Sequence, residues 1–321
     1  MLWLRFVISS LVIVAAGIRL TRDVDILSDR LGLGKVWIGA LVLGLVTSLP
    51  EAITSLSAVI YLDAGDLAVG NIMGSNSFNP MLMVLMDAFY RQGSVTNAIR
   101  PAVSQKVSAI LASAMILGIT AAIWFGLGKG FSWGMVLVYF GGMWCLSKSR
   151  PPEPVVDEEG TGVACWMIML RVGIAAAAVV IGAFFLTASA DRLAETTGLG
   201  ETFFGSVFLA CVTSLPEMVV SLSAVGIGSF DLAIGNIFGS NMSNVFIAAL
   251  CDLFYSGDGL WRQVAKANIL MGGLSLVLTL ILMMGIHKRK KVRQGLGTDS
   301  WLMLGVFLGG VYGLYQIRGL P

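Results

Sequence analysis

Apolar residues fill ten long runs along this chain, and short polar segments separate the runs. Most runs approach or exceed the roughly 20 residues that a helix needs to cross a hydrocarbon core about 30 Å thick. The apolar positions are continuous and do not alternate with polar ones, which favours helices over the strands of a membrane barrel. The pattern therefore predicts an all-α polytopic membrane protein with ten transmembrane helices.

The expected helices form two sets of five. The first set covers residues 2–20, 36–62, 67–89, 103–125 and 133–146, and the second covers 166–188, 203–227, 232–255, 267–286 and 301–317. A proline- and acid-rich stretch between the sets is predicted to be a loop. We therefore divide the chain into a first repeat over 1–147, a short polar connector over 148–163 and a second repeat over 164–321.

An internal duplication supports this division. The segment VTSLPEAITSLSAV at 46–59 returns as VTSLPEMVVSLSAV at 212–225, and DLAVGNIMGSNSFN at 66–79 returns as DLAIGNIFGSNMSN at 231–244. The signature helices are thus 36–62 and 67–89 in one half, and 203–227 and 232–255 in the other. Because five is an odd number, the two halves are expected to cross the membrane in opposite directions, as an inverted-topology repeat of the kind found in transporters.

Composition agrees with a membrane protein and excludes several functions. Hydrophobic residues make up 56% of the chain, charged residues 12%, and the mean hydropathy is +0.85, whereas soluble domains carry about 25% charged residues. The basic residues lie in short loops, so we expect the lipid bilayer, and no nucleic acid, as a partner. The single histidine, His287, lies in a basic run, so no zinc-peptidase motif or serine–histidine pair is present and no enzyme is expected.

The distribution of basic residues predicts an orientation in the cell membrane. Fourteen Lys and Arg residues fall on the side of the basic run HKRKKVR, six on the other side, and Arg171 lies within an expected helix. Cytoplasmic loops carry the excess of Lys and Arg. We therefore expect both termini to be extracellular.

A proline and a glutamate stand side by side within two of the apolar runs, as Pro50–Glu51 and Pro216–Glu217. Proline in a helix frees the carbonyl four residues earlier, and a freed carbonyl at membrane depth is tolerated only inside protein or beside water. An ionisable side chain at the same depth is costly and indicates a functional site. Carboxylates and carbonyls are the oxygen ligands that Ca²⁺ binds.

Hydroxyl and amide side chains accompany both glutamates at helical spacing, and each offers an oxygen to a cation. If the two halves meet near the midplane, these residues would form one oxygen-rich cage with two negative charges. The predicted metal-binding residues are Glu51, Glu217, Thr47, Thr213, Ser48, Ser214, Ser75, Ser240, Asn79 and Asn244.

Each of these features, taken alone, also fits a simpler structural role. Proline is often a simple kink, a lone glutamate can pair with Arg171, and hydroxyls can bond their own helix. The glycines of GNIMG and GNIFG fit a packing role. Asp63, Asp66 and Asp231 fit a helix N-cap role, whereas the sequence leaves the roles of Asp87 and Asp252 open. Because these features recur together and in register, the duplication favours a cation site.

The segments TSLPE and GNxxGSNxxN, present once in each half, resemble the α-repeats of the sodium/calcium exchanger family within the cation/calcium antiporter superfamily. The resemblance implies a compact prokaryotic type in which Glu51 and Glu217 bind calcium and also serve sodium. It further implies that Thr47, Thr213 and the four serines complete the sodium sites, with Asn79 and Asn244 lining the centre. Some members carry Asp where this chain has Asn244, so the sodium stoichiometry stays open.

We therefore expect a secondary antiporter that exchanges Ca²⁺ for Na⁺ by alternating access, working as a monomer. The two ions are substrates, and no cofactor is expected. A Ca²⁺/H⁺ or other divalent cation antiporter of the same superfamily is the alternative. A cation channel is a further alternative, although channels usually build their pores by symmetric assembly.

Overall fold

The computed structural model describes residues 2–90, 92–149, 163–196, 212–257, 259–287 and 296–318. Within these ranges the chain forms helices joined by turns, and no strand occurs. Six helices are long and apolar enough to cross a bilayer, and the bent pair Lys35–Thr47 and Leu49–Leu62 adds a seventh span if counted as one. The chain is a multi-pass helical membrane protein, whereas ten spans and two inverted halves stay predictions.

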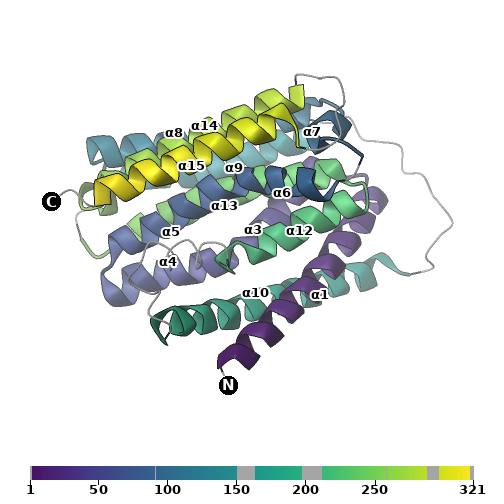
Figure 1. Ribbon diagram of the computed structural model, residues 1–321, viewed down its shortest axis with the longest axis horizontal. Coiled ribbons are helices and arrows are strands. Elements are labelled where there is room, and N and C mark those ends of the chain that lie inside the picture. Colours follow the sequence, from purple (N-terminus) through teal and green to yellow (C-terminus); the bar gives the residue numbers. More distant parts are fainter. Residues whose placement is uncertain are drawn as a thin grey trace.

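The helices follow the order of the apolar runs (Figure 1). The first half contains α1 (Leu2–Arg30), α2 (Lys35–Ile38), the π-helical turn η1 (Gly39–Leu43), α3 (Gly44–Thr47), α4 (Leu49–Leu62), α5 (Gly65–Phe78), the 3-10 turn η2 (Asn79–Met81), α6 (Leu82–Phe89), α7 (Val95–Ala98), α8 (Val103–Phe125) and α9 (Lys129–Lys148). The second half contains α10 (Cys165–Thr196), α12 (Leu215–Gly226), α13 (Phe230–Phe254), the 3-10 turn η3 (Leu260–Arg262), α14 (Ala267–His287) and α15 (Thr298–Arg318).

Helix ends and breaks depart from the hydropathy pattern in several places. Helix α1 continues ten residues past its expected end, where Arg19 bonds Asp23 one turn later at 2.8 Å, because hydropathy marks the membrane-embedded part of a helix and not its polar extension. The expected helices 36–62 and 67–89 are each interrupted. Residues 203–211 of one expected helix, most of the connector, and the basic run after His287 lie outside the described residues.

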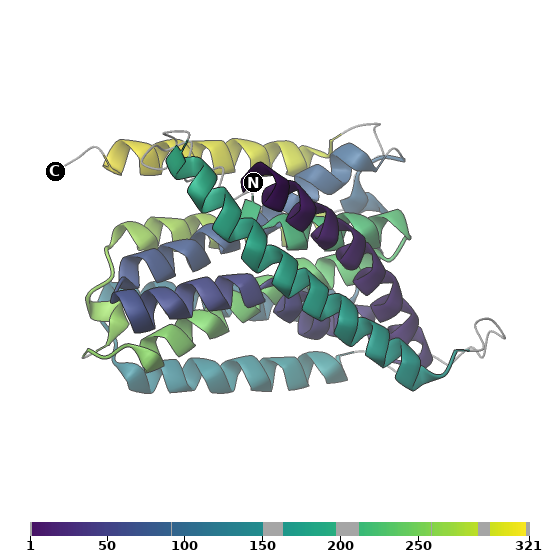
Figure 2. The ribbon, with the colours of Figure 1, turned by 90° about the horizontal axis from the view of Figure 1, so that it is seen from below.

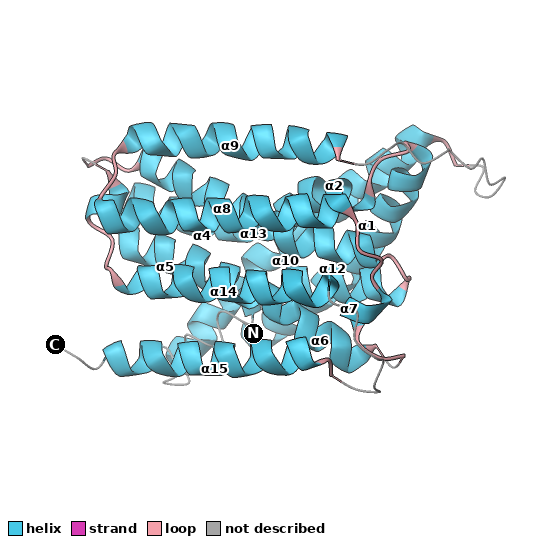
Figure 3. Ribbon diagram, turned by 90° about the horizontal axis from the view of Figure 1, so that it is seen from above, coloured by secondary structure: helices cyan, strands magenta, loops and turns pink. Residues whose placement is uncertain are grey.

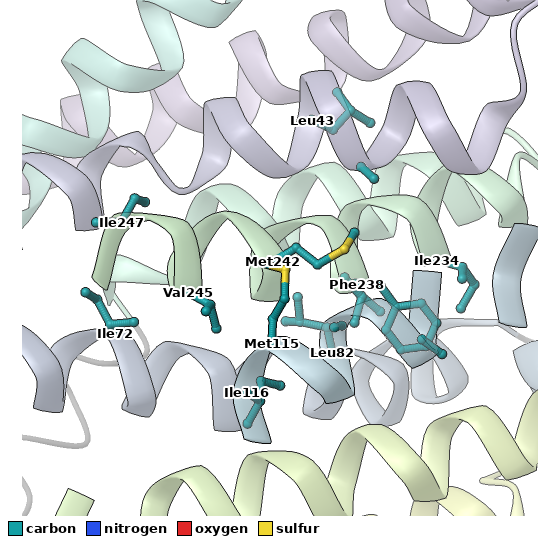
Figure 4. Close-up of a cluster of buried hydrophobic side chains, with 14 of the residues drawn as sticks. Leu43, Ile72, Leu82, Met115, Ile116, Ile234, Phe238, Met242, Val245 and Ile247 are labelled. Atoms are coloured by element: carbon teal, nitrogen blue, oxygen red, sulfur yellow. The ribbon is translucent and has the colours of Figure 1, made fainter. Parts of the chain in front are cut away.

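Helix α13 forms the centre of the bundle. It contacts the first-half elements η1, α3, α4, α5, α8 and α9 as well as its own neighbour α12. Its side chains Phe238 and Met242 are almost completely buried and lie beside Leu82 of α6 and Met115 of α8 (Figure 4). The second half therefore places its signature helix inside a shell built mostly by the first half.

Helices α1 and α10 form a pair that crosses one face of the bundle obliquely (Figure 2). They pack against each other over much of their length, and α1 also contacts α12. Their outer side chains, such as Leu11 and Ile174, are apolar and more than half exposed. Such a surface suits contact with lipid.

Asp66 and Asp231 each tie one half to the other. Asp66 accepts a 2.6 Å hydrogen bond from the backbone N–H of Ala265, just before α14. It accepts a second bond, at 3.3 Å, from the side chain of Asn268 in the first turn of α14. Asp231 accepts a 2.6 Å bond from Gln105 in the first turn of α8. The expected N-cap role is wrong for all three aspartates. Asp66 and Asp231 lie at the second position of their own helices and face a neighbouring one, and Asp63 directly follows the last residue of α4.

Asp87 and Asp252 make a second pair of such ties. The carboxylate of Asp87 accepts bonds from Val95 of α7 and from Ser300 of α15, at 2.7 and 2.6 Å. The carboxylate of Asp252 accepts bonds from the backbone of η3 and from Ser132 of α9, at 2.6 and 2.5 Å. Both aspartates are therefore structural. Together the four carboxylates hold the late helices of each half to the signature helices of the other. These late helices are labelled α8, α9, α14 and α15 in Figure 3.

Candidate functional site

Both VTSLPE segments interrupt a helix at the serine before the proline. Ser48 has φ −86° and ψ 0°, Ser214 has φ −85° and ψ 9°, and each is followed by a new helix with proline in its first turn. The axes before and after Ser48 differ by 48°. Pro50 has no N–H to give to the carbonyl of Val46, so the helix that ends with the bond from Ser48 N–H to Gly44 is not continued in register. The expected proline interruption is present in both halves.

Glu51 and Glu217 occupy the first turns of α4 and α12 and are 1% and 0% exposed. None of their four carboxylate oxygens has a hydrogen-bond partner. The alternative in which a glutamate pairs with Arg171 does not hold, since that residue is exposed on α10 and the ion pairs of the described residues involve Arg19 and Lys35. The two carboxylates are close enough for their charges to interact. A cation bound to these two buried carboxyl groups would offset the cost of burying them without partners.

Thr47 and Ser240 join the two halves beside these carboxylates. Their hydroxyl oxygens lie 3.1 Å apart, and Ser240 lies 3.4 Å from the carbonyl of Gly44. This approach depends on glycine, because a Cβ at Gly44 would lie 2.7 Å from the backbone of α13, and one at Gly239 would lie 2.3 Å from Ala40. The expected packing role of the GNIFG glycines is confirmed, and it places Ser240 against the end of α3.

The remaining predicted hydroxyls differ in their contacts. Ser48, Ser75 and Ser214 are buried, and none of their hydroxyl oxygens has a partner. Thr213 is partly buried on the turn before the second break. Ser75 lies close to Glu51, and Thr47 of the first half lies close to Glu217 of the second.

The predicted amides Asn79 and Asn244 are both fully buried on the partner helices. Asn79 donates a 2.9 Å hydrogen bond from Nδ2 to Oδ1 of Asn241, which leaves its own Oδ1 without a partner. Asn244 has no partner at either side-chain atom. Each amide therefore has an oxygen available to a cation.

Three further asparagines were missed as site residues, although their recurrence in the duplicated motif was visible. Asn236 donates to Ser221 at 2.9 Å and to the carbonyl of Glu217 at 3.4 Å, and it accepts a 3.5 Å contact from Thr47. Its repeat counterpart Asn71 donates to Ser55 at 3.1 Å. These two residues hold the signature helices together. The third missed residue is Asn241, which accepts a hydrogen bond from Asn79.

The donor set of the site consists of oxygen. The two carboxylates lie near each other, with Ser75, Thr47 and Ser240 beside them where the halves meet. The described part of the chain has no group of three His, Cys, Asp or Glu residues that could hold a metal ion. Oxygen sets of this kind suit Ca²⁺ and other hard cations, whereas soft or borderline metals favour thiolate and imidazole. The geometry can hold a hard cation and offers no nucleophile–base pair.

Comparisons with known proteins agree with this chemistry. The family model described as sodium/calcium exchanger protein matches residues 1–147 and 167–317. The chain is 27% identical over 257 residues to the inner membrane protein YrbG of Escherichia coli, which covers 75% of this chain and 76% of that protein. It is 36% identical over 110 residues to the sodium/calcium exchanger MaX1 of Methanosarcina acetivorans, covering 34% of this chain and 31% of that protein.

The fold is similar to solved structures of the sodium-calcium exchanger NCX_Mj. A crystal soaked with 10 mM Na⁺ and zero Ca²⁺ superposes with a TM-score of 0.78 over 98% of this chain and 100% of that chain, at 20% identity. A crystal soaked with 2.5 mM Na⁺ and 0.1 mM Sr²⁺ gives 0.73 at 19% identity, over all of both chains. At this identity the likeness establishes the fold.

Proposed function

Because the chain belongs to the sodium/calcium exchanger family, we propose that it exchanges Ca²⁺ for Na⁺ across a membrane by alternating access at this site. The observation that carries the proposal is the pair Glu51 and Glu217, both fully buried and both without a hydrogen-bond partner. A buried carboxylate without a partner is costly, and a bound cation offsets that cost. The presence of one such group in each half supports a shared site.

The proposed ligands divide by charge. The two carboxylates balance one Ca²⁺, and neutral oxygens complete its coordination of six to eight. When Na⁺ replaces Ca²⁺, the hydroxyls and carbonyls beside the breaks allow several smaller charges to bind at once. The neutral ligands in this proposal are Thr47, Thr213, Ser48, Ser214, Ser75, Ser240, Asn79 and Asn244.

Two inverted halves of five spans each would give this site access to either side in turn. In transporters of that architecture the ions bind near the midplane, and one part of the protein rocks against the other. The contacts between Thr47 and Ser240 and between Asn79 and Asn241 support this arrangement, because each joins the two halves across the site.

The coupling ion is tested by ⁴⁵Ca uptake into proteoliposomes, with outward Na⁺ and H⁺ gradients imposed separately. We expect uptake only with internal Na⁺. If three Na⁺ leave for each Ca²⁺ that enters, one net positive charge moves outward, so an inside-positive potential should accelerate uptake. Uptake driven by a pH gradient in sodium-free medium, with no response to Na⁺, would overturn the sodium assignment in favour of Ca²⁺/H⁺ exchange.

A further inference from the structure

The repeat places two pairs of buried amides at the contact between the halves. Asn76 and Asn79 of the first half correspond to Asn241 and Asn244 of the second, and all four are 0% exposed. An exact two-fold relation would give two amide bonds, one from Asn79 to Asn241 and one from Asn244 to Asn76. The structure has the first bond, at 2.9 Å, whereas the side chains of Asn244 and Asn76 have no partners.

Pro80 accounts for part of this difference. It has no counterpart in the second half, where Val245 continues the regular helix α13. Without an N–H, Pro80 leaves the carbonyl of Asn76 free, and Ser275 of α14 donates to that carbonyl at 2.8 Å. The backbone at Asn76 is therefore attached to α14, and the next turn is the 3-10 segment η2 that begins at Asn79.

The bond from Asn79 has a consequence for the site. An asparagine presents a carbonyl oxygen on one side and two N–H donors on the other, and only the oxygen can bind a cation. By accepting from Nδ2, Asn241 fixes the rotation of the Asn79 amide and leaves Oδ1 as its free atom. Partners of this kind orient metal ligands in many proteins.

We propose that Asn241 is a positioning residue that holds the Asn79 amide with its oxygen available to the bound cation, and that Asn76 does not serve Asn244 in this way. The proposal rests on the proposed cation site and adds an asymmetry to it. One central amide is oriented before an ion binds, whereas the other has to be oriented as the ion binds.

The test measures Ca²⁺ binding to the purified full-length protein by calorimetry. Asn241→Ala should weaken binding about 10- to 100-fold, the usual cost of losing a ligand's supporting partner. Asn76→Ala is the matched control, since it removes an equally buried amide at the equivalent position, and its affinity should stay within about threefold of the wild type. Asn241→Leu, which replaces the amide with an apolar side chain of similar size, should repeat the loss of Asn241→Ala if the alanine variant folds poorly.

A double variant separates positioning from a general structural effect. If Asn241 acts through Asn79, then Asn79→Ala and the double variant Asn79→Ala/Asn241→Ala should bind Ca²⁺ equally, within about twofold. The proposal would be overturned by any of three results. The losses in affinity could multiply in the double variant, the Asn241 and Asn76 variants could lose affinity equally, or Asn241→Leu could bind Ca²⁺ as tightly as the wild type. A wild-type protein that binds no Ca²⁺ would instead overturn the proposed function itself.

Discussion

The two halves of this protein carry the same hexapeptide, VTSLPE, in different surroundings. At the hexapeptide the halves agree, because Ser48 and Ser214 share one backbone conformation and Glu51 and Glu217 are equally buried. They differ one helix later. In the first half that helix breaks at Asn79–Pro80 into three segments, whereas in the second half it runs unbroken from Phe230 to Phe254.

The comparison separates what a repeated sequence specifies from what its packing specifies. Local rules repeat, since proline breaks the helix and glutamate follows it in both halves. Packing does not repeat, because α13 lies in the middle of the bundle and meets η1 and α3 through Gly235 and Gly239. The two half-sites are therefore similar in composition and different in their contacts.

The largest expected effect concerns the two glutamates, at which the halves have the same structure. Glu51→Gln and Glu217→Gln should each reduce Ca²⁺ exchange to the level of liposomes without protein, because each removes one of the two charges that balance the ion. Thermal unfolding should occur at the same or a higher temperature, since a buried charge without a protein partner is replaced by a neutral group. Normal exchange in either variant would show that the two glutamates are not equivalent parts of one site.

A second, smaller effect tests the packing of α13 against the first half. Gly239→Ala would place a Cβ 2.3 Å from the Cα of Ala40, so the backbones have to separate at a cost of about 1–3 kcal/mol. We expect a lower unfolding temperature and weaker Ca²⁺ binding, because Ser240 moves away from Thr47. The control is Gly134→Ala on the exposed side of α9, where nothing lies within 4 Å of the new methyl group. An unfolding temperature of the Gly239 variant equal to that of the control would contradict this packing.

The smallest expected effect concerns the break at Asn79–Pro80, at which the halves differ. Ser275→Ala leaves the carbonyl of Asn76 without its donor, which should reduce the free energy of unfolding by about 1–2 kcal/mol. In a Pro80→Ala background the same change should cost less, because the new alanine restores an N–H that can bond Asn76 as in a regular helix. Chemical or thermal unfolding of the four proteins measures the coupling. Equal costs of Ser275→Ala in both backgrounds would show that Pro80 is not the cause of this asymmetry.

Much of the fold was predictable because membrane helices can be recognised by the length of their apolar runs. The range 103–125 coincides with α8, and the breaks at Ser48 and Ser214 follow from proline alone. The extension of α1 to Arg30 was not predictable from hydropathy, because its polar last turns are stabilised by the ion pairs of Asp25 and Asp29 with Lys35. The 3-10 turn at Asn79 was missed, although Pro80 is the next residue.

The predicted site residues were chosen by oxygen chemistry and by recurrence, and the structure brings Thr47, Ser240 and both glutamates to one region. Sequence reasoning could not assign which amide bonds which, because that depends on how closely α13 approaches the first half. It also could not assign Asp87 and Asp252, whose partners Ser300 and Ser132 lie far away along the chain.

The four aspartate ties bear on how the chain is made. Helices α8 and α9 leave the ribosome before Asp231 and Asp252, the carboxylates in the other half to which their first turns are bonded. When the first half of a nascent chain enters the bilayer, its donors Gln105 and Ser132 therefore have no acceptor, because Asp231 and Asp252 have not yet been synthesised. The two halves therefore have to pack together after both have been synthesised. A chain cut in the connector should recover its packing only when both fragments are produced together.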